Sequence, residues 1–119
     1  MTDPQELLPL PALSLYLLLA LAEGPAHGWA VIKRIRALTE GRSDPSSGSL
    51  YLAMIRLEEQ GLVEETNAPR GEESTDARRR YHRLTAFGRK VLRAETDRMA
   101  ALVEHARSRR IMPLLEDHG

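Results

Sequence analysis

Three hydroxyl side chains stand together where a helix is expected to begin, at the end of the turn-forming segment 43–48. They are Ser46, Ser47 and Ser49. A helix N-terminus presents unpaired backbone N–H groups, and these bind phosphate well when hydroxyls stand beside them. Ordinary capping of the helix is the simpler explanation, but a single cap position cannot use all three serines. The cluster therefore predicts a helix end that contacts a phosphate backbone.

Further candidate contact residues lie on the same helix and on its neighbours. Tyr51 and Arg56 follow the serines, and Arg56 shares the expected outer face with Ser49. Tyr51 could instead be half-buried against a hairpin, and Arg56 could be solvated or paired with Glu59. The candidates on other elements are basic: Lys33 on the preceding helix, and Arg78, Arg79 and Arg80 on a strand, where the alternative is a solvated run.

The charges are segregated along the chain, although the formal net charge of the 119 residues is zero. Residues 27–42 and 78–93 are basic, and residues 57–76 are acidic. Charges that lie farther from a ligand than the Debye length of about 8 Å are screened by salt, so the ligand responds only to the charges near it. Overall neutrality therefore does not exclude a polyanionic partner. We expect the stem of a hairpin to contact phosphate and its acidic tip to stay outside or to become disordered.

Several classes of function are excluded by what the sequence lacks. It has no cysteine, no Gly-rich phosphate loop, no nucleophile elbow and no zinc-protease helix. Its histidines are not spaced as metal ligands are, and His27 is expected to cap a helix or to pack against its neighbours, so we expect no metal site. Since the catalytic and phosphate-binding motifs are missing, we expect no cofactor and no enzymatic activity. The longest apolar run, residues 13–22, is too short to cross a bilayer. Asp3 and Glu6 stand ahead of it, where a signal peptide would have lysine or arginine, so we expect a buried helix. These features predict a soluble, cytoplasmic protein with no membrane partner.

The periodicity of apolar residues predicts four helices and two strands. The helices are expected over residues 12–23, 28–39, from 47 or 49 to 60, and from a Thr85 cap to about 111; the strands over 62–67 and 79–84. The faces predicted to be buried are Trp29, Ile32, Ile35 and Leu38 on the second helix, and Leu50, Ala53, Met54 and Leu57 on the third. The predicted fold is mainly α with a small β-hairpin, a winged helix-turn-helix over residues 8–85 followed by a dimerisation helix over residues 86–116.

The last helix carries an apolar stripe that is too long for so small a core to cover. Because a long isolated helix is not self-supporting, a second copy of the chain is its natural cover. The alternative is that the helix folds back on its own domain. The residues expected at the dimer interface are Leu92, Met99, Leu102, Val103 and Ala106.

Four strings, in order and in register over about residues 13–106, resemble the PadR family of bacterial transcriptional regulators. They are Leu17-Leu18-Leu19-Ala20-Leu21-Ala22-Glu23-Gly24-Pro25-Ala26-His27-Gly28-Trp29, Ser47-Gly48-Ser49-Leu50-Tyr51, Leu57-Glu58-Glu59-Gln60-Gly61-Leu62-Val63 and Arg79-Arg80-Tyr81-His82-Arg83-Leu84-Thr85-Ala86-Phe87-Gly88. Trp29 stands where the family has tyrosine, and Ser47 and Leu52 stand where it has proline. The family's sequence preference therefore does not carry over.

The resemblance implies a homodimeric transcription factor, expected to be a repressor, that reads an inverted repeat in duplex DNA. In the short subfamily the single C-terminal helix swaps onto the partner subunit. A winged-helix module that binds another protein instead of DNA is the alternative. A small-molecule effector between the paired terminal helices is compatible with either function, and the sequence leaves its identity and its existence open.

Overall fold

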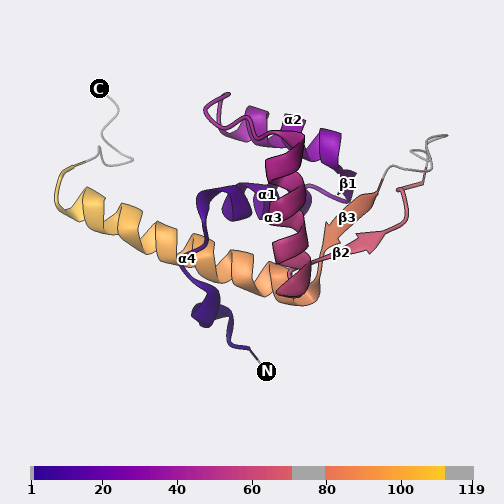
Figure 1. Ribbon diagram of the computed structural model, residues 1–119. Helices are drawn as coiled ribbons and strands as arrows, with labels where there is room; N and C mark the ends of the chain where they lie inside the picture. Colours follow the sequence, from indigo (N-terminus) through magenta and orange to yellow (C-terminus); the bar gives the residue numbers. More distant parts are fainter. Residues whose placement is uncertain (1, 71–79, 112–119) are drawn as a thin grey trace.

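The computed structural model describes residues 2–70 and 80–111 (Figure 1). Its elements are η1 (Pro4–Leu7), α1 (Ala12–Ala22), β1 (Ala26–His27), α2 (Gly28–Leu38), α3 (Ser47–Glu59), β2 (Val63–Thr66), β3 (Tyr81–Leu84) and α4 (Ala86–Ser108). Every predicted helix and strand is present, with ends within three residues of the prediction. The structure adds a short 3-10 helix, η1, and a two-residue strand, β1. The mainly α fold with a small β element is confirmed.

Helix α1 lies at the centre of the core because almost every residue in it is apolar. Leu17, Leu18 and Leu21 are fully buried there. Helix α2 and helix α3 both contact α1 and each other, and α3 buries the four residues predicted for its inner face. Burial of such side chains from water is the main favourable contribution to folding.

The predicted inner face of α2 is wrong at both of its ends. The buried stripe is Val31, Ile32 and Ile35, whereas Leu38 is exposed and Trp29 is 51% exposed. At 100° per residue Trp29 points about 110° away from the centre of that stripe. Ile32 and Ile35 are buried as predicted, but Val31 and not Trp29 completes the buried face at the start of the helix.

The sheet has three antiparallel strands in the order β1-β3-β2, where the sequence predicts two. The hairpin of β2 and β3 pairs Val63 with Leu84 at one end and Thr66 with Tyr81 at the other. Strand β1 adds Ala26 opposite His82, so the wing is attached to the segment between α1 and α2. No periodic pattern can indicate a strand of two residues.

Helix α4 begins in the core and then extends beyond the rest of the molecule (Figure 1). Thr85 caps it by accepting a hydrogen bond from the Gly88 N–H, 2.9 Å away. Val91, Leu92 and Glu95 are buried, and from Thr96 onward none of the described residues of α4 is buried. Leu92 therefore packs in the protomer's own core, which corrects its expected place at a dimer interface.

No described helix is both long enough and apolar enough to span a membrane.

Candidate nucleic-acid interface

The N-terminal end of α3 is exposed, as the serine cluster predicts. Ser46 is the N-cap: its hydroxyl accepts a hydrogen bond from the Ser49 N–H at 3.1 Å and donates to the Ser49 hydroxyl at 3.0 Å. Ser47 and Gly48 are exposed between them. One serine therefore caps the helix, and the three hydroxyls surround a helix end that is open to a phosphate.

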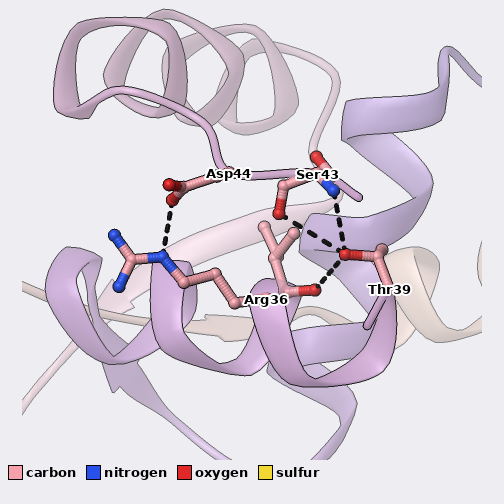
Figure 2. Close-up of polar contacts among 5 residues, drawn as sticks. Arg36, Thr39, Ser43 and Asp44 are labelled. Atoms are coloured by element: carbon pink, nitrogen blue, oxygen red, sulfur yellow. Dashed lines mark hydrogen bonds and ion pairs between the residues drawn. The ribbon is translucent and has the colours of Figure 1, made fainter. Parts of the chain in front are cut away.

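The turn between α2 and α3 is held by polar contacts, which Figure 2 shows. The Thr39 hydroxyl accepts a hydrogen bond from the Ser43 N–H at 3.1 Å and donates to the Ile35 carbonyl at 2.8 Å. The Arg36 guanidinium forms an ion pair with Asp44. Gly41, with φ of +78°, adopts the left-handed conformation that lets the chain reverse after α2. These contacts fix where α3 begins relative to α2.

The outer face of α3 presents both polar and apolar side chains to solvent. Tyr51 is 60% exposed, and Leu52 and Arg56 are also exposed. The prediction that Arg56 faces outward is confirmed. An α-helix with such a face has the dimensions to enter the DNA major groove.

The basic residues of α2 are employed in two different ways. The Lys33 ammonium lies 5.3 Å from the centre of the Trp29 ring, and Arg36 lies 5.4 Å from it, both as cation–π contacts. Lys33 remains exposed on this surface. Arg34 instead donates hydrogen bonds to the carbonyls of Ala20 and Gly24, at 3.1 and 2.7 Å. It therefore caps the C-terminal end of α1, a structural role that the charge pattern does not reveal.

The arginines of the wing stem are paired with glutamates of β2. Arg83 lies 2.8 Å from Glu64, and Arg80 lies 3.4 Å from Glu65. Both pairs are exposed, so they stabilise the fold by at most about 1 kcal/mol each and can be exchanged for a phosphate. The other two predicted contact residues of the stem, Arg78 and Arg79, lie outside the described residues.

A cavity of about 400 Å³ lies between the start of α2, the side of α3 and the stem of the wing. It brings together Ser47, Tyr51 and Arg80 from the predicted set, and adds Trp29, which sequence reasoning placed in the core. His27 also lines it. Its side chain accepts a hydrogen bond from the Ala30 N–H at 3.3 Å and packs edge-on against Tyr81, so its predicted capping role is confirmed.

Three more polar residues line the same cavity and were missed as a group. The buried imidazole of His82 lies 2.7 Å from the Glu58 carboxylate, which ties β3 to α3. Glu65 faces them from β2. Positions 58, 65 and 82 have no regular spacing, so only the fold of the wing against α3 reveals that they meet.

The sequence profile of the PadR-like family of transcriptional regulators matches residues 17–94, more than half of the chain. The chain belongs to the PadR-like family. The match runs from α1 to the buried half of α4, the part that builds the core and the cavity. That family is described as one of transcriptional regulators.

A curated relative of this PadR-like protein is an uncharacterized 37.1 kDa protein in transposon TN4556 of Streptomyces fradiae. The two are 41% identical over 85 residues, which is 71% of this chain and 22% of the relative. The chain thus spans about a fifth of the length of that relative.

Solved structures similar to this PadR-like protein share its fold. A transcriptional regulator from Clostridium thermocellum matches with a TM-score of 0.65 at 24% identity, covering 81% of this chain and 87% of that one. A PadR family transcription regulator from Clostridium difficile R20291 matches at 0.67 and 22%, covering 82% and 97%. Bacillus subtilis PadR, solved in complex with operator DNA, matches at 0.59 and 15%, covering 71% and 46%.

Four of the five predicted dimer residues lie on the extended half of α4. Met99, Leu102 and Val103 are exposed apolar side chains, and Ala106 is half-buried. Leu102 is 58% exposed. These residues share one face of the helix, because they follow a spacing of three to four residues.

Proposed function

We propose that this PadR-like regulator binds duplex DNA with α3 in the major groove and the stem of the wing on the phosphate backbone. The observation that carries the proposal is the exposed N-terminal end of α3: Ser46 caps the Ser49 N–H, and the N–H groups of the exposed residues Ser47 and Gly48 have no carbonyl partner within the helix. Arg80 and Tyr51 line the cavity that begins beside it. Bacillus subtilis PadR, a similar fold, was solved with operator DNA.

The exposed side chains of α3 divide between positioning and reading. Hydroxyls and Arg80 suit phosphate, which every sequence offers, and therefore set the register of the protein on DNA. Tyr51 and Arg56 are long enough to reach base edges, and Leu52 offers an apolar contact to a thymine methyl group. Lys33 adds positive charge from α2. Arg78 and Arg79 remain proposed phosphate ligands from the sequence.

We propose further that the regulator acts as a homodimer through the exposed half of α4. Met99, Leu102 and Val103 form an apolar face on a helix that extends away from the core, and a packed partner is what stabilises such a helix. A two-fold dimer places two copies of α3 about 34 Å apart, one turn of DNA. The expected target is therefore an inverted repeat.

From the family resemblance we propose that the protein represses transcription. We also propose that it acts in the cytoplasm. Release by a small-molecule effector between the paired α4 helices stays a prediction from the sequence. We propose the division between residues 85 and 86 as one of function, with DNA binding before it and dimerisation after it. It does not divide the core, because the first half of α4 contributes Val91 and Leu92 to it.

Selection of bound fragments from random and genomic duplexes, followed by footprinting, tests the proposal directly. We expect a palindromic consensus and protection of two successive major grooves. Binding should weaken steeply between about 50 and 200 mM salt, because phosphate neutralisation releases counterions. Failure to enrich any sequence, together with binding of a protein target that salt does not affect, would favour the interaction module instead.

A further inference from the structure

We propose that Glu58, Glu65 and His82 form a binding site for one divalent transition-metal ion between α3 and the wing. Each residue offers one ligand atom, and these atoms lie within 4.8 Å of one another. The residues come from α3, β2 and β3, three elements that enclose the cavity. Ligands of one ion lie roughly 3–4 Å apart, so small rotations of the two exposed glutamates complete the site.

The imidazole is the fixed point of this site. The side chain of His82 is only 8% exposed, and its Nε2 atom lies 2.7 Å from the Glu58 carboxylate. Its Nδ1 atom is buried and has no hydrogen-bond partner among the described residues. Nε2 is therefore the ligand atom that His82 offers, and a bound ion would replace the hydrogen bond between Nε2 and the Glu58 carboxylate.

The charge of the cavity also favours a cation. Two carboxylates, those of Glu58 and Glu65, lie in a surface proposed to approach DNA; Arg80 lies 3.4 Å from Glu65, and His82 lies 2.7 Å from Glu58. Negative charge at such a place repels phosphate. An ion on both carboxylates would remove the repulsion and would release Arg80 for a phosphate contact.

The ligand set selects the class of metal. One imidazole with two carboxylates suits zinc, cobalt, nickel, manganese or ferrous iron, whereas magnesium and calcium prefer oxygen ligands alone. Three protein ligands leave positions for water, and the cavity has room for it. We therefore expect cobalt and zinc to bind and magnesium not to bind.

The test uses the single tryptophan of the chain, Trp29, which lines the same cavity. Untagged protein freed of metal by a chelator is titrated with Co²⁺, and the fluorescence of Trp29 is followed. We expect saturable quenching at one ion per chain, competition by Zn²⁺ and no effect of Mg²⁺.

Variants locate the site. Glu58→Gln, Glu65→Gln and His82→Gln should each weaken Co²⁺ binding at least about tenfold. Glu64→Gln is the matched control, because Glu64 neighbours Glu65 on β2 but pairs with Arg83 instead. The two glutamates of the site are exposed, so their variants should fold even if His82→Gln does not. Unsaturable quenching, or equal Co²⁺ affinity in wild type and both glutamine variants of these exposed residues, overturns the site.

A second measurement concerns regulation and rests on the proposed function. Zn²⁺ should tighten DNA binding several-fold in wild type and in Glu64→Gln, and should have no effect in Glu58→Gln. A protein that binds Co²⁺ at this site but binds no DNA would retain the metal site and refute the proposed function. A protein that binds DNA but shows no saturable quenching by Co²⁺ would refute the metal site and leave the proposed function intact.

Discussion

At the scale of single residues, the proposed DNA contacts separate into side chains that meet phosphate and side chains that reach bases. Arg80 stands on the wing stem, and its exposed pair with Glu65 holds it only weakly. Tyr51 and Ser49 belong to the helix that is proposed to enter the groove. The two kinds of contact should therefore respond differently to mutation.

Arg80→Ala should weaken binding to operator and to random duplex by similar factors, and should lower the slope of log affinity against log salt by about one unit. Tyr51→Phe and Ser49→Ala should reduce operator affinity more than random-duplex affinity, because they alter the fit to one sequence. Fluorescence anisotropy with labelled duplexes at several salt concentrations measures both effects. Equal losses on both duplexes for all three variants would contradict the division.

Glu95 shows a different residue-scale effect, since it is a carboxylate that is only 1% exposed. Its oxygens accept hydrogen bonds from the Arg98 guanidinium and from the Leu10 N–H, the latter at 2.8 Å. The hydrogen bond from Arg98 lowers the pKa of Glu95, against the opposing effect of burial. Glu95 thereby fastens the N-terminal segment to α4.

Because the pKa of Glu95 is lower in the folded state, its contribution to stability is full above the ordinary glutamate pKa of 4.5 and is lost as the pH falls through the folded value. Glu95→Gln should lower the free energy of unfolding by about 1–2 kcal/mol at pH 7, and the deficit should shrink in acid. Urea denaturation from pH 7 to pH 3 measures it. Glu104→Gln, an exposed control on α4, should show no such trend.

The residue roles that were predictable from the sequence are those that depend on near neighbours in the chain. Ser46 and His27 cap helices through atoms three residues away, a distance that local pattern covers. The roles of Arg34 and Glu95 were not predicted. The partners of Arg34 lie 10 and 14 residues away, and Glu95 binds Leu10, 85 residues away, in addition to its neighbour Arg98. Such partners are set by packing and not by spacing.

At the scale of elements, the long amphipathic segments were predictable and the short ones were not. The helices α1, α3 and α4 have periodic patterns or continuous apolar runs. Gly24 and Gly61 mark the C-terminal ends of α1 and α3, and the Thr85 cap marks the start of α4. Strand β1 and helix η1 are too short to show a period. The error on α2 arose because Trp29, a large apolar residue, lines an exposed cavity and is not part of the core.

The junction between α3, the wing and α4 depends on one close approach. A Cβ atom on Gly88 would lie 2.0 Å from the Leu62 carbonyl oxygen, and the same carbonyl accepts a hydrogen bond from the Thr85 N–H at 3.1 Å. The first turn of α4 can therefore rest on Leu62 only if residue 88 has no side chain.

Gly88→Ala should lower the free energy of unfolding by about 2–3 kcal/mol, because a buried backbone must move to accept the methyl group. Gly48→Ala is the control: nothing lies within 4 Å of its Cβ position, and alanine favours a helix, so its stability should be unchanged or about 1 kcal/mol higher. Thermal denaturation followed by circular dichroism compares the two. A stable Gly88→Ala variant would disprove the close contact.

At the scale of the whole molecule, α4 serves two functions along its length. Its first half completes the core of the protomer, and its second half extends from it with an apolar face (Figure 1). The sequence predicted this stripe but could not locate the change between the halves. That change follows Glu95, which is the last buried residue of α4 and accepts a hydrogen bond from the Leu10 N–H.

Leu102→Asp should raise the dissociation constant of the dimer by more than about tenfold, because an unpaired carboxylate would be buried in the interface. Ala101→Asp is the matched control, since Ala101 is exposed on the opposite face of the same turn. Sedimentation over a range of protein concentrations measures the dissociation constant. A wild-type protein that remains monomeric at every concentration would refute the dimer.

The internal use of arginines has a consequence for how this regulator would find its target. Arg34 caps α1, and the carboxylates of Asp44 and Glu64 offset the charges of Arg36 and Arg83 as long as no phosphate displaces them. A count of basic side chains thus overstates the cations that this face offers to a nucleic acid. Long-range attraction would be modest, nonspecific adhesion to chromosomal DNA would be low, and discrimination would depend on short-range fit at the end of one helix.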